Sequence, residues 1–528
     1  MSYYLRVESV NLSYFIDDTN DLSTIRGGGL LLLEAMEIVE EIIKKYSPKK
    51  AMLDTDNINQ LESKLKKLKN SKSTKTSRKK IKAIEEQIRS NTDNEDSAST
   101  ITKGASWGLF NLDMSFQEAY NIKNEVINFF NKDQSQYQHA TIVVDLHINN
   151  GFEQYQNDRD SLQTLNHWQQ MQAPSLAICK QGSTSCAIDK VRPATENRYL
   201  KDKNKDYVSD SVHQRREYGR NQKQAFYKKT IQEDKELTEK IANIKFTENL
   251  KELSQSRKPR FLDEKIAYIY IDGNKFGDIQ RKSKSPDNQQ KFDQNTRTGR
   301  EKVLTNILNK ILANTSQSDW RTEEGNIRLE TLLWGGDEII WVVPAWQGWW
   351  MINEFYKEAS KHIIININDK NPLFHAAGLV FCHHNAPIHR INALARNLAD
   401  QFAKEACRNK NYIAYQVLES FDHAGTQLKN YRGKRIKNLG QWQHLLVEAE
   451  KIDEITTAVT ALKNDTEFAQ RKIYQILHAY KSNEQKKAEQ YIAKLPEKSE
   501  KHISELKNIF GNENAHWLHL IDLWNYID

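Results

Sequence analysis

The stretch Leu333-Trp334-Gly335-Gly336-Asp337-Glu338-Ile339-Ile340-Trp341 places two adjacent carboxylates after a two-glycine turn, between two apolar runs. Glycine accepts backbone angles that other residues avoid, and it lets a ligand approach the main chain closely. Apolar runs on both sides of a short glycine turn are typical of a β-hairpin. The stretch therefore predicts a hairpin that presents acid groups at its tip.

A second stretch, upstream of the first, carries another carboxylate at the end of a strand. Residues 266–271 form an apolar run, and Asp272-Gly273-Asn274-Lys275-Phe276-Gly277 follows it directly. We expect a buried strand that ends at Asp272, then a glycine-bracketed turn that opens a helix. Such a turn suits phosphate groups, because backbone N–H groups and a helix N-terminus attract anions.

Two strand ends that each carry a carboxylate predict a site for Mg²⁺ or Mn²⁺. Magnesium is usually held by one or two carboxylates together with substrate phosphates, and a pair of ions can stabilise the attacking and leaving oxygens of a phosphoryl transfer. We assign Asp272 and Asp337 to metal binding and catalysis. Glu338 is either a further catalytic ligand or a side chain on the opposite face of its strand. The carbonyl oxygen of Ile271 is an additional candidate ligand.

The composition describes a polar chain with one strongly basic segment. The net charge is +7 and hydrophobic residues make up 38% of the chain. Residues 61–90 contain 11 Lys or Arg against 3 Glu, so the rest of the chain is nearly neutral. The segment is either a solvated insertion or a charged contact for nucleic acid or a partner. No apolar run is long enough to span a membrane, no signal-peptide pattern is present, and four cysteines in a long chain predict a cytoplasmic protein without disulfides.

The spacing of cysteine and histidine does not favour zinc. Cys179 and Cys186 are followed by no second close pair, whereas zinc sites usually show tighter pairs. Cys382, His383 and His384 lie together, with His389 nearby, but neighbouring residues on a strand point to opposite faces of the sheet. We therefore expect buried free cysteines and surface histidines.

Hydrophobic patterns predict an α+β chain in four parts. Residues 1–155 form a first α+β unit with a Lys-rich insertion at about 54–100, and residues 156–260 form a largely helical connector. Residues 261–428 form a second α+β unit, and residues 429–528 are helical without a strand signal. The first unit is expected to have strands at 5–15, 105–112 and 139–148, with helices at 30–46 and 115–131. The second is expected to have strands at 266–271, 327–333, 339–343, 375–381 and 412–418, with helices at 300–314, 346–361 and 387–407.

The connector carries a basic group whose role the sequence leaves open. Arg215, Arg216, Arg220 and Lys223 recur along one predicted helix. They either reach triphosphates or RNA, or they form a solvated helix face. We expect the solvated face, because surface charge runs are common on helices.

Together, these motifs resemble the palm domain shared by GGDEF-type cyclases and the polymerase family that forms the large subunit of type III CRISPR effectors. Residues 374–381 look like the strand that follows the catalytic hairpin in the CRISPR branch. Residues 387–404 look like the next helix, which carries a phosphate-binding lysine in the cyclases, here Lys404. Residues 21–30 look like part of the first, degenerate palm of the CRISPR family. The resemblance covers residues 265–427 well and residues 1–149 weakly.

The resemblance implies a fold, an activity and a set of binding residues. The fold would be two ferredoxin-like palms joined by a helical connector, followed by a helical C-terminal domain. The activity would be nucleotidyl transfer that makes a cyclic oligonucleotide or cyclic dinucleotide from nucleoside triphosphates, usually ATP, in antiviral defence, with Mg²⁺ or Mn²⁺ and no organic cofactor. The nucleotide-binding residues would be Gly273, Asn274, Lys275, Phe276, Gly277, Gly335, Gly336, Lys404 and Arg26, with Arg26 near a second nucleotide.

The chain departs from the family pattern in three ways. Glu338 stands where the family usually has a second aspartate, and a glutamate is still a hard oxygen ligand for Mg²⁺. The first palm lacks equivalent acids, so we expect one active centre. No His-Asp pair occurs in the chain, so the nuclease domain often fused to this family is expected to be missing.

Several functions remain open at this stage. The chain is either the large subunit of an RNA-guided complex, with RNA and other effector subunits as partners, or a stand-alone signalling enzyme. A different class is a non-catalytic scaffold that binds RNA or protein, although adjacent carboxylates repel phosphates and give a scaffold no advantage. A third is a template-dependent palm polymerase, which would use the same two-metal chemistry.

Overall fold

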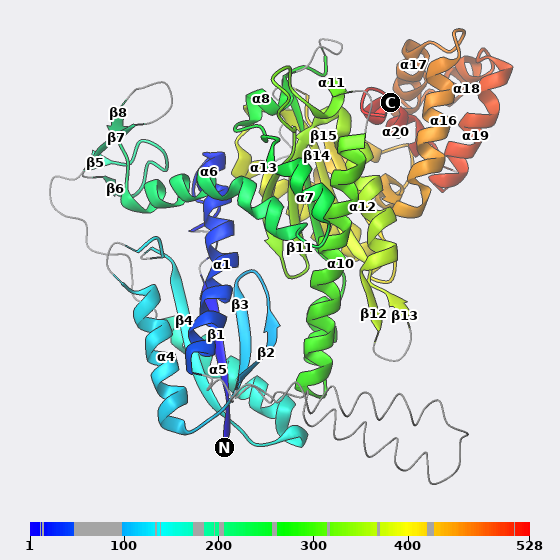
Figure 1. Cartoon of the computed structure of the whole chain (residues 1–528). Coiled ribbons are helices and arrows are strands. Elements are labelled where there is room, and N and C mark those ends of the chain that lie inside the picture. The colour runs from blue at the N-terminus through cyan, green and yellow to red at the C-terminus, as the bar shows by residue number, and fades with distance from the viewer. Residues whose placement is uncertain are drawn as a thin grey trace, which may run out of the picture.

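The computed structural model describes most of the chain in two α+β units and a helical C-terminal region (Figure 1). The described residues are 1–10, 12, 15–46, 98–132, 135–137, 139–172, 184–194, 196–199, 205–255, 261–313, 317–366, 370–419, 427–511 and 513–527. The basic part of the predicted insertion lies outside these ranges, as does Cys179. Among the described helices, none is both long and apolar enough to cross a membrane.

The first unit is a four-stranded sheet with the strand order β2-β3-β1-β4, in which each neighbouring pair is antiparallel. Helices α1 and α4 connect the strands in the order β-α-β-β-α-β, the ferredoxin-like arrangement. Helix α4 begins after Ser115, whose side chain accepts from the Glu118 N–H in a capping box. The elements are β1 (Ser2–Val10), α1 (Leu22–Tyr46), β2 (Ala98–Lys103), β3 (Trp107–Asp113), α4 (Phe116–Phe130) and β4 (Thr141–Asn149).

The second unit is a six-stranded sheet whose first four strands repeat that arrangement. Its order is β10-β11-β9-β14-β15-β16, and only β14 and β15 are parallel. Helices α10 and α12 pack on one face of the sheet, and α13 packs on the other. The main elements are β9 (Lys265–Gly273), α9 (Phe276–Arg281), α10 (Pro286–Ala313), α11 (Gln317–Trp320), β10 (Glu330–Gly335), β11 (Glu338–Pro344), α12 (Gly348–His362), β12 (Ile364–Asn366), β13 (Lys370–Pro372), β14 (His375–His383), α13 (Ile388–Leu398), α14 (Lys404–Ala406) and β15 (Tyr412–Val417).

Between the two units the described chain is mainly helical, but it also contains strands that the sequence did not predict. Two small hairpins, β5 with β6 and β7 with β8, form two-stranded sheets beside α6 (Figure 1). Their strands are only two or three residues long, too short to show a hydrophobic pattern. The elements are α5 (Tyr155–Gln172), β5 (Thr184–Ser185), β6 (Pro193–Ala194), β7 (Asn197–Tyr199), β8 (Lys205–Tyr207), α6 (Asp210–Thr230), α7 (Lys235–Ala242) and α8 (Leu250–Ser254).

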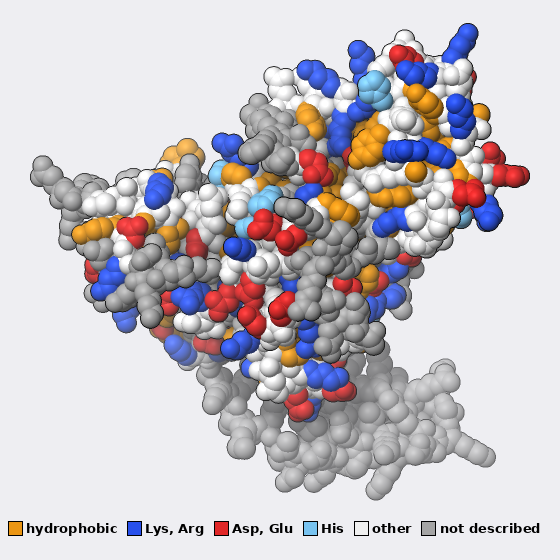
Figure 2. All heavy atoms as spheres, turned by 90° about the horizontal axis from the view of Figure 1, so that it is seen from above, with side chains coloured by type: hydrophobic (Ala, Val, Ile, Leu, Met, Phe, Trp, Pro, Cys, Tyr) orange, Lys and Arg blue, Asp and Glu red, His pale blue; other side chains and the backbone are white. Residues whose placement is uncertain are grey.

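The C-terminal region is helical, and one short strand joins it to the second sheet. Strand β16 (Leu446–Glu448) pairs with β15, so the expectation that this region lacks strands is wrong at this point. The helices are α15 (Leu428–Ile436), α16 (Ile452–Asn464), α17 (Gln470–Lys481), α18 (Gln485–Ile492), α19 (Glu497–Ile509) and α20 (Ala515–Leu523). Acidic and basic side chains are interspersed over the face seen in Figure 2, which fits the nearly neutral charge of the chain outside its basic segment.

Helix α1 begins earlier than predicted, and its glycines lie inside the helix. The backbones of α1 and α6 touch, because a Cβ on Gly27 would lie 1.8 Å from the Arg215 carbonyl oxygen and one on Gly219 would lie 2.0 Å from the Ser23 carbonyl oxygen. A Cβ on Gly29 would likewise lie 2.8 Å from the Leu332 carbonyl oxygen in β10. The glycines therefore serve close packing, a role that a sequence pattern of consecutive glycines does not distinguish from a loop.

The basic group on α6 is largely buried, so the predicted solvated helix face is wrong. Arg215 is fully buried and donates to Asp18 at 2.8 Å. Lys223 is 7% exposed and donates to Glu330 at 2.6 Å. Only Arg220 of this group lies at the surface. These cations neutralise acids at the junction of the two units.

Candidate functional site

Strand pairing brings the three predicted catalytic carboxylates to one end of the second sheet. Ile339 of β11 pairs with Ile271 of β9, which places Glu338 beside Asp272. The Gly273 N–H donates to the Asp337 carbonyl oxygen at 3.1 Å and ties the hairpin tip to the end of β9. Ile271 lies in mid-sheet, paired on both sides.

The tyrosine two residues before Asp272 decides the orientation of Glu338. The Tyr270 hydroxyl lies 2.6 Å from Glu338 Oε1 and 3.2 Å from Asp272 Oδ2. Residues two apart on a strand share a face, so Tyr270 and Asp272 project together and Glu338 joins them. Of the two orientations that the sequence left open, the structure has Glu338 on the face of Asp272.

Burial and mutual repulsion raise the pKa values of the two aspartates. Burial, followed by the charge of Asp337, raises the pKa of Asp272 to about 7, although Lys404 acts in the opposite direction. Burial and the charge of Glu338 also raise the pKa of Asp337. Crowded, partly desolvated carboxylates favour whatever brings positive charge between them. Their hard oxygen atoms are the donors that Mg²⁺ and Mn²⁺ prefer, so the residues present fit such an ion.

Two cations from the helical layer contact the carboxylates. Lys404 forms an ion pair with Asp272 and lies 3.0 Å from Asp400. Arg396 Nη1 donates to Glu338 Oε1 at 2.8 Å, and its guanidinium lies 4.5 Å from the centre of the Tyr270 ring. A π-helical turn, Ala399–Ala403, separates Arg396 from Lys404 and keeps both on the face toward the sheet.

Sequence reasoning missed Tyr270, Arg396 and Asp17. Asp17 follows β1, and burial raises its pKa while the charge of Arg396 lowers it. The sequence did carry a signal for Tyr270, because residues two apart on a strand share a face and Tyr270 is therefore expected on the face of Asp272. Arg396 had a weaker one, the four-residue spacing of Asn392, Arg396, Asp400 and Lys404. Asp17 had none, because its position depends on how the two units pack.

The turn after β9 is well ordered by contacts of its own. Gly273 is required, because a Cβ there would overlap the Phe276 ring at 2.5 Å. The Asn274 N–H donates to the Phe374 carbonyl oxygen at 2.8 Å. Lys275 adopts a φ of 63° and its Nζ donates to Asn409 at 2.7 Å. Phosphate binding by this turn stays a prediction.

A cleft runs from the hairpin tip to the edge of the first sheet. The two hairpin tips touch, because a Cβ on Gly335 would lie 1.9 Å from the Ala105 Cβ in the β2–β3 turn. The cleft encloses about 510 Å³ of space, open solvent included. Its walls combine the tip and the turn after β9 with the β2–β3 turn and basic positions on α10: Gly277, Gly336, Asp337, Thr102, Lys103, Gly104, Arg297 and Arg300.

Arg26 lies away from this cleft and has a structural role. It is 3% exposed, and its guanidinium donates to Glu330 at 2.6 and 2.9 Å and to the Gly219 carbonyl oxygen at 2.8 Å. All of these partners are buried between α1, α6 and β10. These buried contacts do not favour the predicted role of Arg26 near a second nucleotide, which stays a prediction.

The prediction of buried free cysteines is confirmed for Cys186 and Cys382, whereas Cys407 is free but only half-buried. His389 lies apart from them, with Nδ1 2.9 Å from Asn20 Oδ1. His383 and His384, in contrast, lie together beside Glu264.

The arrangement of the two units matches solved structures of one kind. A chain of the Csm1–Csm4 cassette in complex with cA4 aligns with a TM-score of 0.50 at 9% identity, over 100% of this chain and 70% of its own length. The chain has the Csm1 fold. Csm1 in T.onnurineus aligns with a TM-score of 0.42 at 10% identity, over 100% of this chain and 70% of its own length. A type III-B Cmr-beta chain in the apo state aligns with a TM-score of 0.43 at 9% identity, over 90% of this chain and 74% of its own length.

Sequence comparison finds nothing at this distance. No family model matches the chain, and no curated protein does. The Csm1 fold is therefore recognised from the spatial arrangement, in agreement with the type III CRISPR resemblance of the motifs.

Proposed function

We propose that this protein is a metal-dependent nucleotidyltransferase that makes cyclic oligonucleotides from nucleoside triphosphates, with ATP as the first candidate substrate. The observation that carries the proposal is the cluster of Asp272, Asp337 and Glu338 beside a cleft between two β-α-β-β-α-β units. The Csm1–Csm4 cassette with the same fold was solved with cA4, which supports an adenine nucleotide as substrate or product. The two units would be two palms, of which only the second is catalytic.

Asp272 and Asp337, with Glu338 beside them, would hold one or two divalent cations. Bound there, Mg²⁺ or Mn²⁺ would neutralise the triphosphate and polarise the α-phosphate for attack by a ribose hydroxyl. The ionised carboxylates are needed for this, and because burial and the charge of Asp337 raise the pKa of Asp272 to about 7, a proton would compete with the cation at lower pH.

Basic side chains on both sides of the carboxylates would receive the phosphates. Arg297 and Lys103 line the cleft from α10 and from the edge of the first sheet. Lys404 keeps its charge next to Asp272, where an anionic triphosphate would otherwise be repelled. Arg300 holds the hairpin tip through the Gly336 carbonyl oxygen and stays at the cleft wall. The cleft therefore supplies positive charge from both units.

Tyr270 and Arg396 would orient Glu338. Both donate to Glu338 Oε1, so they fix the carboxylate in one rotamer. The longer glutamate side chain needs this support more than an aspartate would, because it has one more rotatable bond. Tyr270 and Arg396 are therefore positioning residues.

Within type III CRISPR defence, the protein would act with other effector subunits. The fold match to a Csm1–Csm4 cassette supports a Csm4-like subunit as partner. RNA would be the activating signal in such a complex.

The test is product formation from each α-labelled nucleoside triphosphate with Mg²⁺ or Mn²⁺, resolved by chromatography. Wild type should give a cyclic product from ATP, and Asp337→Asn should lower its rate more than about 100-fold, because even outer partners of metal ligands change activity 10–100-fold. Ser106→Ala, at the tip of the first hairpin, is the matched control and should keep the rate. Reactions with and without RNA, partner subunits and a template strand separate an inactive scaffold, an activated synthetase and a polymerase.

A further inference from the structure

A second group of metal-binding side chains lies at the opposite end of the second sheet. Lys265 pairs with His383 at one end of β9 and β14, and Gly273 pairs with His375 at the other. These ends are eight residues apart, or roughly 26 Å along the strand. The group at the Lys265 end consists of Glu264, His383 and His384, and it is separate from the carboxylates proposed to act in catalysis.

The end of β14 explains why two neighbouring histidines face the same way. His383 is the last residue of the strand and His384 is the first residue of the turn, so strand alternation no longer applies. The His384 N–H donates to the Glu264 carbonyl oxygen at 2.8 Å, which fixes this turn against the residue before β9. The two imidazole rings stack with their centres 4.7 Å apart. The sequence-based expectation that neighbouring strand residues point to opposite faces therefore fails for His383 and His384, because the strand ends between them.

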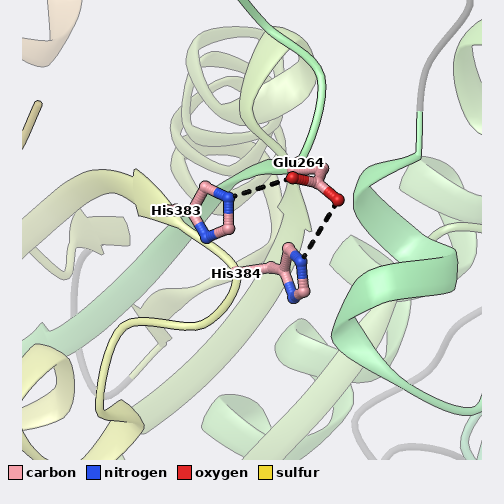
Figure 3. A group of neighbouring side chains, drawn as sticks. All are labelled: Glu264, His383 and His384. Atoms are coloured by element: carbon pink, nitrogen blue, oxygen red, sulfur yellow. Dashed lines mark hydrogen bonds and ion pairs between the residues drawn. The ribbon is translucent and has the colours of Figure 1, made fainter. Parts of the chain in front are cut away.

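The carboxylate of Glu264 lies beside both imidazoles and turns one oxygen toward each of them (Figure 3). Its Oε2 is 3.2 Å from His383 Nε2, and its Oε1 is 3.8 Å from His384 Nε2. One ligand atom from each residue lies within 4.8 Å of the others. Zinc with ligands at about 2.0–2.2 Å brings such atoms to about 3.3 Å from one another, so small side-chain rotations close the site.

We propose that Glu264, His383 and His384 form a binding site for a divalent transition-metal ion, with zinc the best match. Two imidazoles and one carboxylate are a known zinc ligand set that leaves a fourth position open. Glu264 and His383 are partly exposed, at 43% and 39% of their side chains, so an ion can enter from solvent. A bound ion would join the residue before β9 to the end of β14.

The surroundings favour binding in part and oppose it in part. Lys251 adds positive charge nearby and Asp263 adds negative charge. The Asn385 N–H donates to His383 Nδ1 at 3.2 Å, so His383 has to give up this bond when Nε2 binds a metal. His383 should therefore be the weakest of the three ligands.

The experiment measures zinc alone, by elemental analysis of the full chain after chelator treatment and dialysis against Zn²⁺ with excess Mg²⁺. The parent protein carries Asp272→Asn and Asp337→Asn, so the carboxylate cluster cannot contribute and the result does not depend on the proposed activity. We expect one zinc per chain, lost with His383→Ala and His384→Ala together and weakened at least tenfold by Glu264→Gln. His389→Ala, which removes a nearby exposed histidine outside the group, should keep the zinc.

A second readout covers variants that fold poorly. Co²⁺ in the parent protein should give the intense visible absorption of a four-coordinate ion, and Zn²⁺ should raise the Tm of the parent but not that of Glu264→Gln. A parent that binds no zinc, or zinc that remains in the double histidine variant, would overturn the proposal. Equal loss in His389→Ala would do the same, because it would mean adventitious binding to surface histidines.

Discussion

The two sheets share one strand order but differ at the tips of corresponding hairpins. In the second sheet the tip is Gly335-Gly336-Asp337, followed by Glu338, whereas the first sheet has Gly104-Ala105-Ser106 at the same place. The tips touch at Gly335 and Ala105. The packing of the two hairpin tips sets where a site between the units can lie. The side chains of the second tip, Asp337 and Glu338, make that site acidic.

The segments that follow the first strand of each unit, β1 and β9, also differ in how their acids are used. Strand β9 ends with Asp272 and Gly273, and the chain then turns into the short helix α9 beside the carboxylates. After β1 it carries Asp17 and Asp18, and Asp18 pairs with Arg215 and Arg192. Asp18 thus holds α6 and the β5–β6 hairpin. Four substitutions test how far this division of roles extends.

The largest effect should come from breaking the charge cluster that joins the units. Glu330→Met leaves Arg26 and Lys223 buried without their carboxylate, which should lower the free energy of unfolding by about 3–5 kcal/mol. The same substitution at Glu217, a partly exposed residue of α6, should cost less than about 1 kcal/mol. Denaturant unfolding of both variants checks this, and equal values would show that the cluster does not hold the units together.

Asp272→Asn should change the pH dependence of stability. Folding raises the pKa of Asp272 from 3.8 to about 7, so the folded chain holds this proton more tightly than the unfolded chain. The stability that depends on the proton is present below pH 4 and is lost as the pH rises through about 7. The variant lacks this loss. The difference in free energy of unfolding, variant minus wild type, should therefore rise by about 1–4 kcal/mol between pH 4 and pH 8.

Unfolding measured across that range in chelator checks the effect. Asp319→Asn, the same change at a carboxylate of α11 outside the cluster, is the control. A constant difference between Asp272→Asn and wild type at all pH values would contradict the raised pKa.

Gly335→Ala should break the contact of the hairpin tips. Its Cβ would overlap the Ala105 Cβ, and such overpacking costs about 1–3 kcal/mol. Adding Ala105→Gly should restore part of the loss, because it removes the nearest overlapping atom, while the backbone Cα at position 105 would still lie 2.9 Å from the new Cβ. Thermal unfolding of the single and double variants measures this coupling, and no rescue would mean that the tips do not touch in solution. Gly433→Ala, where a Cβ has open space, is the control.

The smallest effect should come from Tyr270→Phe. The change removes one hydroxyl that bridges Asp272 and Glu338, so product formation should fall about 10-fold with little change in Tm. The apparent affinity for Mn²⁺ should fall in parallel, which a purely structural role would not produce. Tyr268→Phe, on the same strand face and 2% exposed, should leave both values unchanged.

Much of the second unit could be predicted from the sequence, because its signals are local. The apolar runs around 266–271 and 339–343 became β9 and β11, and the glycine turn between β10 and β11 lies where the hairpin was expected. Pairing of two strands then brings Asp272 and Glu338 together without further information. The predicted domain boundaries, the metal ions and the roles of the site residues stay predictions.

The signals that failed depend on packing between distant segments. Gly27 and Gly219 are more than 190 residues apart and touch only because α1 crosses α6. Arg26 and Arg215 therefore looked like free cations, although each has a buried acid as its partner. Glu264 was missed as a neighbour of His383 because strand pairing, and not sequence distance, joins them.

The backbone contact between α1 and α6 has a mechanical consequence. At Gly27 and Gly219 the backbones of α1 and α6 are in direct contact, with no side chain between them. A change of side-chain rotamer therefore cannot make room for one helix to slide over the other. Glu330, at the start of β10, is held by a cation from each helix, whereas Gly335, five residues or roughly 17 Å further, meets the first unit at Ala105. Distance labels across the tips should therefore report wider distributions than labels across the helices. We therefore expect relative motion of the two units to be smallest at the helix crossing and larger at the hairpin tips beside the cleft.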